Sequence, residues 1–182
     1  MFDLARAGDL KLIHYLAAGL PPNMANQRGD SLLMLAAYHG HEQLVGAMLG
    51  KTVVVSAATS RSTSATAARG NGEEVPAPVE HAIPTLPPQR QPDVNQLNAK
   101  GQSILAGAVF KTYPAVARLL VEAGADPLAG EPNAEETAKM FRQYEDGGGA
   151  SGQEEGYRRL FENAPGRGKG GVEVGELAPV AR

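Results

Sequence analysis

Apolar residues recur with helical spacing in two pairs of neighbouring stretches. Residues 44–49 and 116–123 place large apolar side chains about one helical turn apart, which is typical of an amphipathic helix. Each is preceded by another apolar stretch that contains alanine, 32–37 or 104–110. A serine directly before each of these preceding stretches is expected to cap a helix with its hydroxyl; the two are Ser31 and Ser103. The pattern therefore predicts two helix hairpins.

The two hairpins belong to an internal repeat. Asn, Gly, Ser, Leu and Ala recur at the same offsets in residues 26–41 and 98–113, which are 72 positions apart. An earlier copy is visible because residues 8–13 match residues 40–45 at an offset of 32, and a degenerate fourth copy begins at Glu131. The period is thus 32–33 residues, interrupted once by about 39 extra residues. Since one helix pair cannot bury its apolar side alone, we expect the copies to stack around a shared core.

The interruption differs from the repeats in composition. Residues 51–91 are rich in Ala, Ser, Thr and Pro and contain no Phe, Tyr or Trp, so little apolar surface offsets an ordering cost of ~1–2 kcal/mol per residue. We expect a disordered insertion between repeats 1–2 (residues 1–50) and repeats 3–4 (92–146). Its Ser/Thr-rich part, 56–66, is either a phosphorylation target or a plain linker. Three further segments are expected: a Gly-rich linker at 147–153, a helix at 154–164 and a flexible tail at 165–182.

The repeats resemble ankyrin repeats. Residues 29–42, Gly-Asp-Ser-Leu-Leu-Met-Leu-Ala-Ala-Tyr-His-Gly-His-Glu, are similar to the ankyrin pattern of a turn glycine, a Thr-Pro-Leu-His start, paired alanines and a Gly-His turn. Residues 119–127 are similar to its closing leucines and Gly-Ala-Asp. The resemblance covers about 105 of 182 residues and implies an all-α solenoid of about four stacked helix-turn-helix units with β-turn tips. Both clear copies lack the Thr-Pro-Leu-His proline, which pre-organises the first helical position.

Composition narrows the range of functions. The chain contains no cysteine, which excludes disulfides, thiolate metal sites and cysteine nucleophiles. The formal net charge is −3, so no nucleic-acid partner is expected, and no apolar run approaches the length of about 18 residues that marks a membrane span. Because the N-terminus has no secretory signal, we expect a cytoplasmic protein, with the nucleus as the alternative, and a monomer.

Candidate catalytic and metal-binding groups are few. His39, His41 and Glu42 lie together, but two histidines two residues apart at a helix end are expected to diverge, and no third ligand is in view. The glycine-rich run 166–171 lacks the Ser or Thr that follows Lys in a phosphate loop, and no Gly-x-Ser-x-Gly motif occurs. We therefore predict no enzyme activity, no metal site and no cofactor.

The remaining candidates are surface positions implied by the resemblance. Ankyrin-repeat proteins usually contact their partners through the β-turn tips and the concave side of the first helices. Carried over by position in the repeat, the candidate partner-binding residues are Arg6, Gln27, Arg28, Asp30, Tyr38, His39, Lys100, Gln102, Phe110 and Lys111. Tyr38 and Phe110 hold equivalent places, and aromatic side chains are enriched in binding hot spots, unless either ring turns inward and packs under the neighbouring copy.

The resemblance implies a non-enzymatic module that binds a partner protein or peptide through the concave ankyrin groove. Because the candidate residues in this groove are aromatic and weakly basic, we expect a ligand with apolar anchors and some acidic character. The alternative is an assembly or chaperone factor that shields a client protein with help from the insertion. Deletion of residues 52–91 separates the two, because only the second function needs the insertion.

Overall fold

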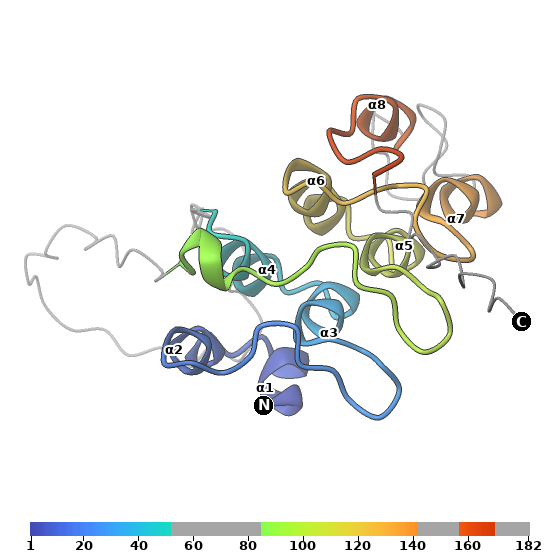
Figure 1. The fold of residues 1–182 in the computed structure, drawn as a ribbon. Helices are drawn as coiled ribbons and strands as arrows, with labels where there is room; N and C mark the ends of the chain where they lie inside the picture. The colour runs from blue at the N-terminus through green and yellow to red at the C-terminus, as the bar shows by residue number, and fades with distance from the viewer. Residues whose placement is uncertain (52–84, 142–156, 170–182) are drawn as a thin grey trace, which may run out of the picture.

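The computed structural model describes residues 1–51, 85–141 and 157–169, and Figure 1 traces the chain through them. These residues form helices joined by turns, without a strand; an isolated antiparallel bridge pairs Ala25 with Ser31. The helices are α1 (Phe2–Ala7), α2 (Lys11–Ala17), α3 (Leu32–Tyr38), α4 (Glu42–Met48), the 3-10 helix η1 (Pro88–Arg90), α5 (Ile104–Phe110), α6 (Pro114–Glu122), α7 (Ala134–Met140) and α8 (Tyr157–Glu162).

The α-helices stack in two rows (Figure 1). The inner row consists of the first helix of each pair, α1, α3, α5 and α7, each packed against the next. The outer row consists of α2, α4, α6 and α8. Within the described residues the chain is therefore an all-α solenoid of four helix pairs, which confirms the predicted fold class. The expected C-terminal helix supplies the outer helix of the fourth pair, because α8 contacts both α6 and α7.

One apolar core runs through the stack. Leu44 and Met48 on α4 and Leu120 on α6 are fully buried, and Leu119 is half-buried against them. Phe161 on α8 is buried in the same core. Full burial of a leucine stabilises the fold by about 1.5–3 kcal/mol, so these positions account for much of the docking between repeats.

No described helix combines the length and apolarity that crossing a membrane requires.

Serine caps start two inner helices. The hydroxyl of Ser31 accepts a hydrogen bond from the backbone N–H of Met34 at 3.1 Å, and that of Ser103 accepts one from Ala106 at 3.1 Å. These bonds satisfy N–H groups that have no partner within the helix. Both predicted caps are therefore confirmed, and they place α3 and α5 in the same register within their repeats.

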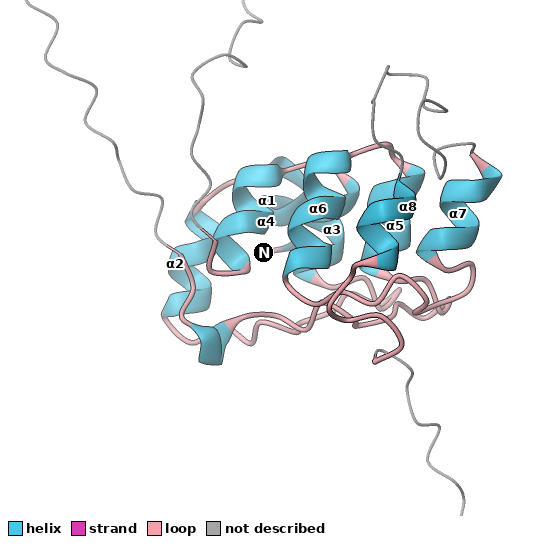
Figure 2. Cartoon of the chain, turned by 90° about the horizontal axis from the view of Figure 1, so that it is seen from above, coloured by secondary structure: helices cyan, strands magenta, loops and turns pink. Residues whose placement is uncertain are grey.

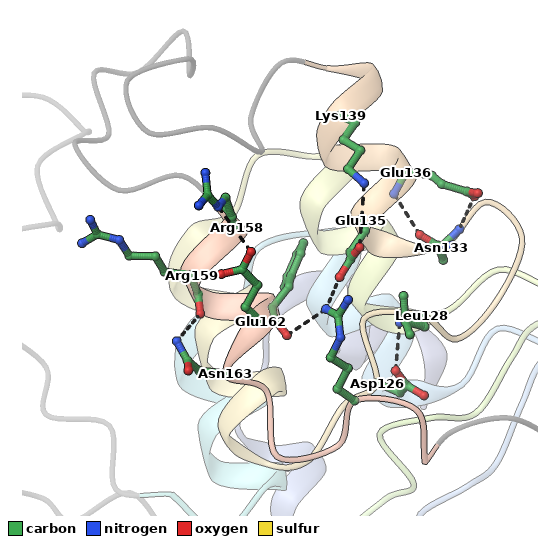
Figure 3. A network of polar contacts seen from close by, with 12 residues as sticks. Asp126, Leu128, Asn133, Glu135, Glu136, Lys139, Arg158, Arg159, Glu162 and Asn163 are labelled. Atoms are coloured by element: carbon green, nitrogen blue, oxygen red, sulfur yellow. Dashed lines mark hydrogen bonds and ion pairs between the residues drawn. The ribbon is translucent and has the colours of Figure 1, made fainter.

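The fourth inner helix starts differently, with a capping box (Figure 3). Asn133 Oδ1 accepts from the backbone N–H of Glu136 at 2.8 Å, and the Glu136 carboxylate accepts from the backbone N–H of Asn133 at 3.3 Å. Glu135 in the first turn of this helix is buried, at 7% exposed, and Arg167, which follows α8, pairs with its carboxylate.

Asparagines organise the β-turn tips that precede α3 and α5. Asn26 Oδ1 accepts from the backbone N–H groups of Arg28 and Asp30 at 2.8 and 3.0 Å. Asn98 Oδ1 accepts in the same way from the second and fourth residues after it, at 3.0 Å each. A backbone bond of 3.0 Å from Ala99 N–H to the Arg28 carbonyl then joins the two tips, so the tips form a connected edge along one side of the stack (Figure 2).

The end of the predicted insertion belongs to the folded stack. Leu86 is 2% exposed, and its N–H donates to the Ala47 carbonyl of α4 at 2.9 Å. Arg90 Nη1 donates to the Leu16 carbonyl near the end of α2 at 3.2 Å. Residues 85–91 therefore form an ordered segment that packs against α2 and α4, rather than part of a disordered insertion. We call this segment the strap. Residues 52–84, with the Ser/Thr-rich part, lie outside the described residues.

The start of the predicted flexible tail is also packed. Gly166 is buried against the backbone of the third repeat, where a Cβ would come within 2.0 Å of the Gly124 carbonyl oxygen. Arg167 Nη1 donates to the Phe161 carbonyl at 3.1 Å as well as pairing with Glu135. Residues 165–169 therefore close the end of the stack. The predicted linker 147–153, the first residues of the predicted helix and residues 170–182 lie outside the described residues.

Candidate functional site

The structure separates the predicted binding residues into two groups at opposite ends of the inner helices. The tip group precedes α3 and α5 and comprises Gln27, Arg28, Asp30, Lys100 and Gln102. The helix-end group lies at the C-terminal ends of α1, α3 and α5 and comprises Arg6, Tyr38, His39, Phe110 and Lys111. A helix of seven residues is about 10 Å long, so the two groups do not form one cluster (Figure 2).

Within the tip group, Asp30 is a structural residue. It is 8% exposed, and its carboxylate accepts from Asn26 Nδ2 and Arg28 Nε at 3.1 Å each and from Asn98 Nδ2 at 3.3 Å. The prediction that Asp30 contacts a partner is therefore corrected, because the carboxylate joins its own tip to the next one. Gln102 also makes an internal bond, accepting from Asn98 Nδ2 at 3.0 Å, although its side chain is exposed.

The helix-end group is organised around two exposed rings. Tyr38 and Phe110 are the last residues of α3 and α5 and are 38% and 47% exposed, so neither turns inward under the neighbouring repeat. Gly107 leaves room for the Tyr38 ring, since a Cβ at Gly107 would lie 3.6 Å from Tyr38 Cδ2. Lys111 Nζ lies 4.6 Å from the Tyr38 ring centroid and 5.9 Å from that of Phe110, within cation–π range of both.

Two further residues extend this surface onto the fourth repeat. Phe141 directly follows α7 and meets Phe110 edge to face, with ring centroids 5.3 Å apart, and is 43% exposed. Met140, the last residue of α7, is 68% exposed. Neither Met140 nor Phe141 was among the binding residues predicted from the sequence. The last residue lies seven positions after the cap in α3, α5 and α7 alike, so counting from Asn133 would have found Met140.

We call Tyr38, Phe110, Lys111, Met140 and Phe141 the aromatic row. It crosses the C-terminal ends of three successive inner helices. Tyr38, Phe110 and Met140 are the last residues of these helices, and Lys111 and Phe141 directly follow α5 and α7.

A basic and histidine-rich area adjoins the row at the first two repeats. The rings of His39 and His41 stack with centroids 6.1 Å apart, and His39 meets Tyr38 edge to face at 5.8 Å. His41 Nε2 hydrogen-bonds the Arg6 carbonyl at 2.5 Å, so His41 joins two repeats. Burial lowers the pKa of His39, and the positive charges of His41, Arg6 and Lys111 lower this pKa further. Within the described residues, no group of three His, Cys, Asp or Glu side chains could hold a metal ion.

Parts of this chain are similar to known proteins. The sequence matches no family model. A Pseudomonas aeruginosa protein described as an ankyrin repeat protein is 59% identical over 46 residues, a match that covers 25% of this chain and spans only 27% of the relative. Among solved structures, the ankyrin repeat domain of human ASB11 aligns with 69% of this chain and 40% of its own, with 19% identity and a TM-score of 0.45. The four stacked helix pairs with their β-turn tips are thus similar to stacked ankyrin repeats, and over 46 residues the sequence is similar to a bacterial protein described as an ankyrin repeat protein.

Proposed function

We propose that this chain is a non-enzymatic protein-interaction module that binds a partner protein through the aromatic row. The observation that carries the proposal is the row itself: three neighbouring inner helices each end in a large apolar side chain that reaches solvent. Contiguous apolar side chains on a surface mark interaction sites more often than single ones do. Aromatic side chains are also the residue type most enriched among binding hot spots.

The way the row is held supports binding. The last residues of α3 and α5 follow a capped first turn and a helix body that is almost entirely buried. Lys111 is held near two rings rather than extended into solvent. A surface that is ordered before it meets its partner loses less conformational entropy on binding. The rings and the ammonium group are therefore suited to contact with another protein.

The test compares the proteins captured by two forms of the chain. Tagged wild-type chain and the Tyr38→Ala/Phe110→Ala double variant are each used as bait in a lysate of the native host, and bound proteins are quantified by mass spectrometry. We expect at least one protein to be enriched by the wild type and depleted about tenfold or more with the double variant, as loss of a hot-spot pair implies.

Tyr15→Ala is the matched control. Tyr15 is 46% exposed on α2, in the outer row, so its removal tests loss of an exposed aromatic side chain away from the row. This variant should capture the same proteins as the wild type. Circular dichroism and thermal unfolding establish that all forms are folded. Equal capture by wild type and folded double variant would show that the row is not the binding surface.

A further inference from the structure

We propose that the aromatic row recognises a ligand segment with a defined chemical order, a carboxylate at the α3 side and an apolar side chain at the α7 side. This inference rests on the proposed function, since it specifies the partner of the same surface. It follows from how charge and apolar area are distributed along the row. The carboxylate is received by Lys111 beside Tyr38, and the apolar side chain by Phe110, Met140 and Phe141.

Positive charges gather at this end of the inner helices. Carboxylates lie in the first turns of α1 and α7, at Asp3, Glu135 and Glu136, whereas cations lie in or next to the last turns. Such an arrangement matches the helix dipole, whose negative end attracts cations. Among the described residues of the inner helices and their C-caps, the cations at this end are Arg6, Lys111 and Lys139.

Of these cations, Lys111 is the one placed to receive a ligand. Arg6 pairs with Asp3 at 2.8 Å, and Lys139 lies 3.9 Å from Glu135. Within the described residues, no carboxylate lies within ion-pairing distance of Lys111, whose ammonium instead rests near the Tyr38 ring. A carboxylate that binds there forms a charge-assisted hydrogen bond with an ammonium group whose position is already restricted.

The other end of the row offers apolar contact. Phe110 and Phe141 form an edge-to-face pair, and Met140 beside them is the most exposed of the large apolar side chains. Methionine adapts its shape to different apolar partners. The basic group therefore lies toward α3 and the apolar group toward α7, and a ligand with only one of the two chemistries would use half of the surface.

The spacing of the helices sets the spacing within the ligand. Packed helices are about 8–10 Å apart, and an extended chain advances about 3.3 Å per residue. Lys111 and the apolar group are about one helix spacing apart along the row, so a segment lying across it should carry its carboxylate and its apolar side chain about three residues apart. The direction of the ligand chain is not specified, because side-chain order can be met by either orientation of an extended backbone.

The experiment uses three end-blocked synthetic peptides and the full chain. The acidic peptide is Asp-Asp-Ser-Ser-Leu-Phe; a neutral one carries Asn and a basic one carries Lys in place of both Asp residues. Binding is followed by fluorescence anisotropy and by NMR shifts of the row residues. We expect the acidic peptide to bind about fivefold or more tightly than the neutral one and the basic peptide to bind weakest. The preference should shrink as salt rises from about 50 to 300 mM, since screening weakens exposed charge pairs.

Two variants separate the ends of the row. Lys111→Gln should remove the preference for the acidic over the neutral peptide, because the charge that attracts the carboxylate is lost. Phe141→Ala should weaken the acidic and neutral peptides by the same factor. Lys11→Gln, an exposed lysine on α2 in the outer row, is the charge control and should bind all three peptides as the wild type does.

The outcomes distinguish this inference from the proposed function. If the basic or neutral peptide binds as tightly as the acidic one, or if Lys111→Gln keeps the acidic preference, the proposed order is wrong although the row still binds peptides. If no peptide shifts the row residues, the inference is overturned. The proposed function is then judged separately by whether the Tyr38→Ala/Phe110→Ala variant loses captured proteins.

Discussion

Asn23 and Asn95 make equivalent hydrogen bonds to the following repeat, although the insertion lies between the two bonded residues in only one case. Asn23 Oδ1 accepts from the backbone N–H of Asp93 at 2.7 Å, and Asn95 Oδ1 accepts from that of Asp126 at 2.8 Å. The two bonds span 70 and 31 residues, a difference of 39. The extra residues are therefore accommodated without a shift in the register of the stack.

This register predicts that residues 52–84 can be replaced by a short Gly/Ser linker without loss of the fold. The ends of this segment are already close, because Lys51 and Leu86 donate their N–H groups to the adjacent carbonyls of Gly46 and Ala47. Shortening a loop about eightfold lowers its closure cost by about 2 kcal/mol at most. We expect urea unfolding to stay cooperative and the free energy of unfolding to rise by ~1–2 kcal/mol.

Leu86→Ala in the full-length chain provides the contrasting control. Leu86 is buried under α4 and outside the deleted segment, so its truncation should lower the free energy of unfolding by ~2–4 kcal/mol, as cavities in a core do. Loss of cooperative unfolding in the linker variant, or an unaffected Leu86→Ala variant, would show that the two halves do not dock as described.

Thr112 occupies a backbone position that suits glycine. Its φ is +59°, whereas Gly40, the corresponding residue of the preceding repeat, has φ +76°. A β-branched residue in the left-handed region is strained by roughly 1–2 kcal/mol. Thr112→Gly should therefore raise the free energy of unfolding by ~0.5–1 kcal/mol after the extra chain entropy of glycine is subtracted, measured by thermal and urea unfolding.

The reciprocal change tests the same geometry. A Cβ at Gly40 would lie 2.8 Å from the ring of Tyr113, so Gly40→Ala combines backbone strain with a steric clash and should destabilise by ~1–3 kcal/mol. Thr112→Ala serves as the control for loss of the threonine side chain, since alanine keeps the strained backbone and should gain less than glycine. A glycine variant no more stable than the alanine variant would rule out strain at this position.

The features predicted from sequence are those whose cause is local. Ser31 and Ser103 bond to residues three positions away, and the apolar stripe of each outer helix recurs every turn, so both are visible in a short window. The strap at 85–91 is different, because its Leu86 and Arg90 find partners on α4 and α2, far along the chain. A single buried leucine in a Pro-rich segment gives no periodic signal.

The candidate site was predictable to the extent that a position in the repeat determines exposure. Tyr38 and Phe110 reach solvent because both end an inner helix. Asp30 holds an equally regular place in its tip, but its burial depends on Asn98 of the next tip, which pattern alone does not reveal. Phe141 was missed because the place that corresponds to Tyr38 and Phe110 in the fourth copy is held by Met140, and Phe141 lies one position beyond it.

The pKa of His39, which lies next to the aromatic row, should be lower than the usual pKa of histidine. Burial and the charges of His41, Arg6 and Lys111 lower the pKa of His39 from 6.5. Lys111→Gln removes one of these charges and should raise this pKa toward 6.5, which an NMR pH titration of the imidazole C–H signals measures. Lys11→Gln, remote on α2, should leave the titration unchanged. An unaltered midpoint in Lys111→Gln would show that Lys111 does not act on His39.

The same shift has a consequence for stability. Because the pKa of His39 is lower in the folded chain, the unfolded chain binds more protons as pH falls through 6.5. This residue therefore disfavours folding fully below its folded-state pKa and ceases to do so above 6.5. We expect the contribution of His39, obtained by comparison with His39→Gln, to favour the wild type more at pH 7.5 than at pH 5.

The segment that follows α8 packs on the fourth repeat through an ion pair with a buried carboxylate. Glu135 is 7% exposed, pairs with Arg167 and lies 3.9 Å from Lys139, which faces it in Figure 3. Arg167→Gln removes the main partner. Breaking a fully buried pair costs ~3–5 kcal/mol, and because the Arg167 side chain is 35% exposed, we expect ~1–3 kcal/mol here. Since Arg167 also holds the Phe161 carbonyl, the loss should appear first in α8 as faster amide hydrogen exchange than in α3.

A second substitution distinguishes the unpaired charge from lost packing. Glu135→Gln added to Arg167→Gln removes the buried charge and should restore more than half of the lost stability, because a neutral amide is less costly to bury. Arg158→Gln breaks the exposed pair with Glu162, whose atoms are 3.3 Å apart, and should cost less than ~0.5 kcal/mol. If Arg167→Gln leaves exchange in α8 unchanged, then the terminal helix is held by Phe161 and the core alone, and the pairing with Glu135 does not contribute to its docking.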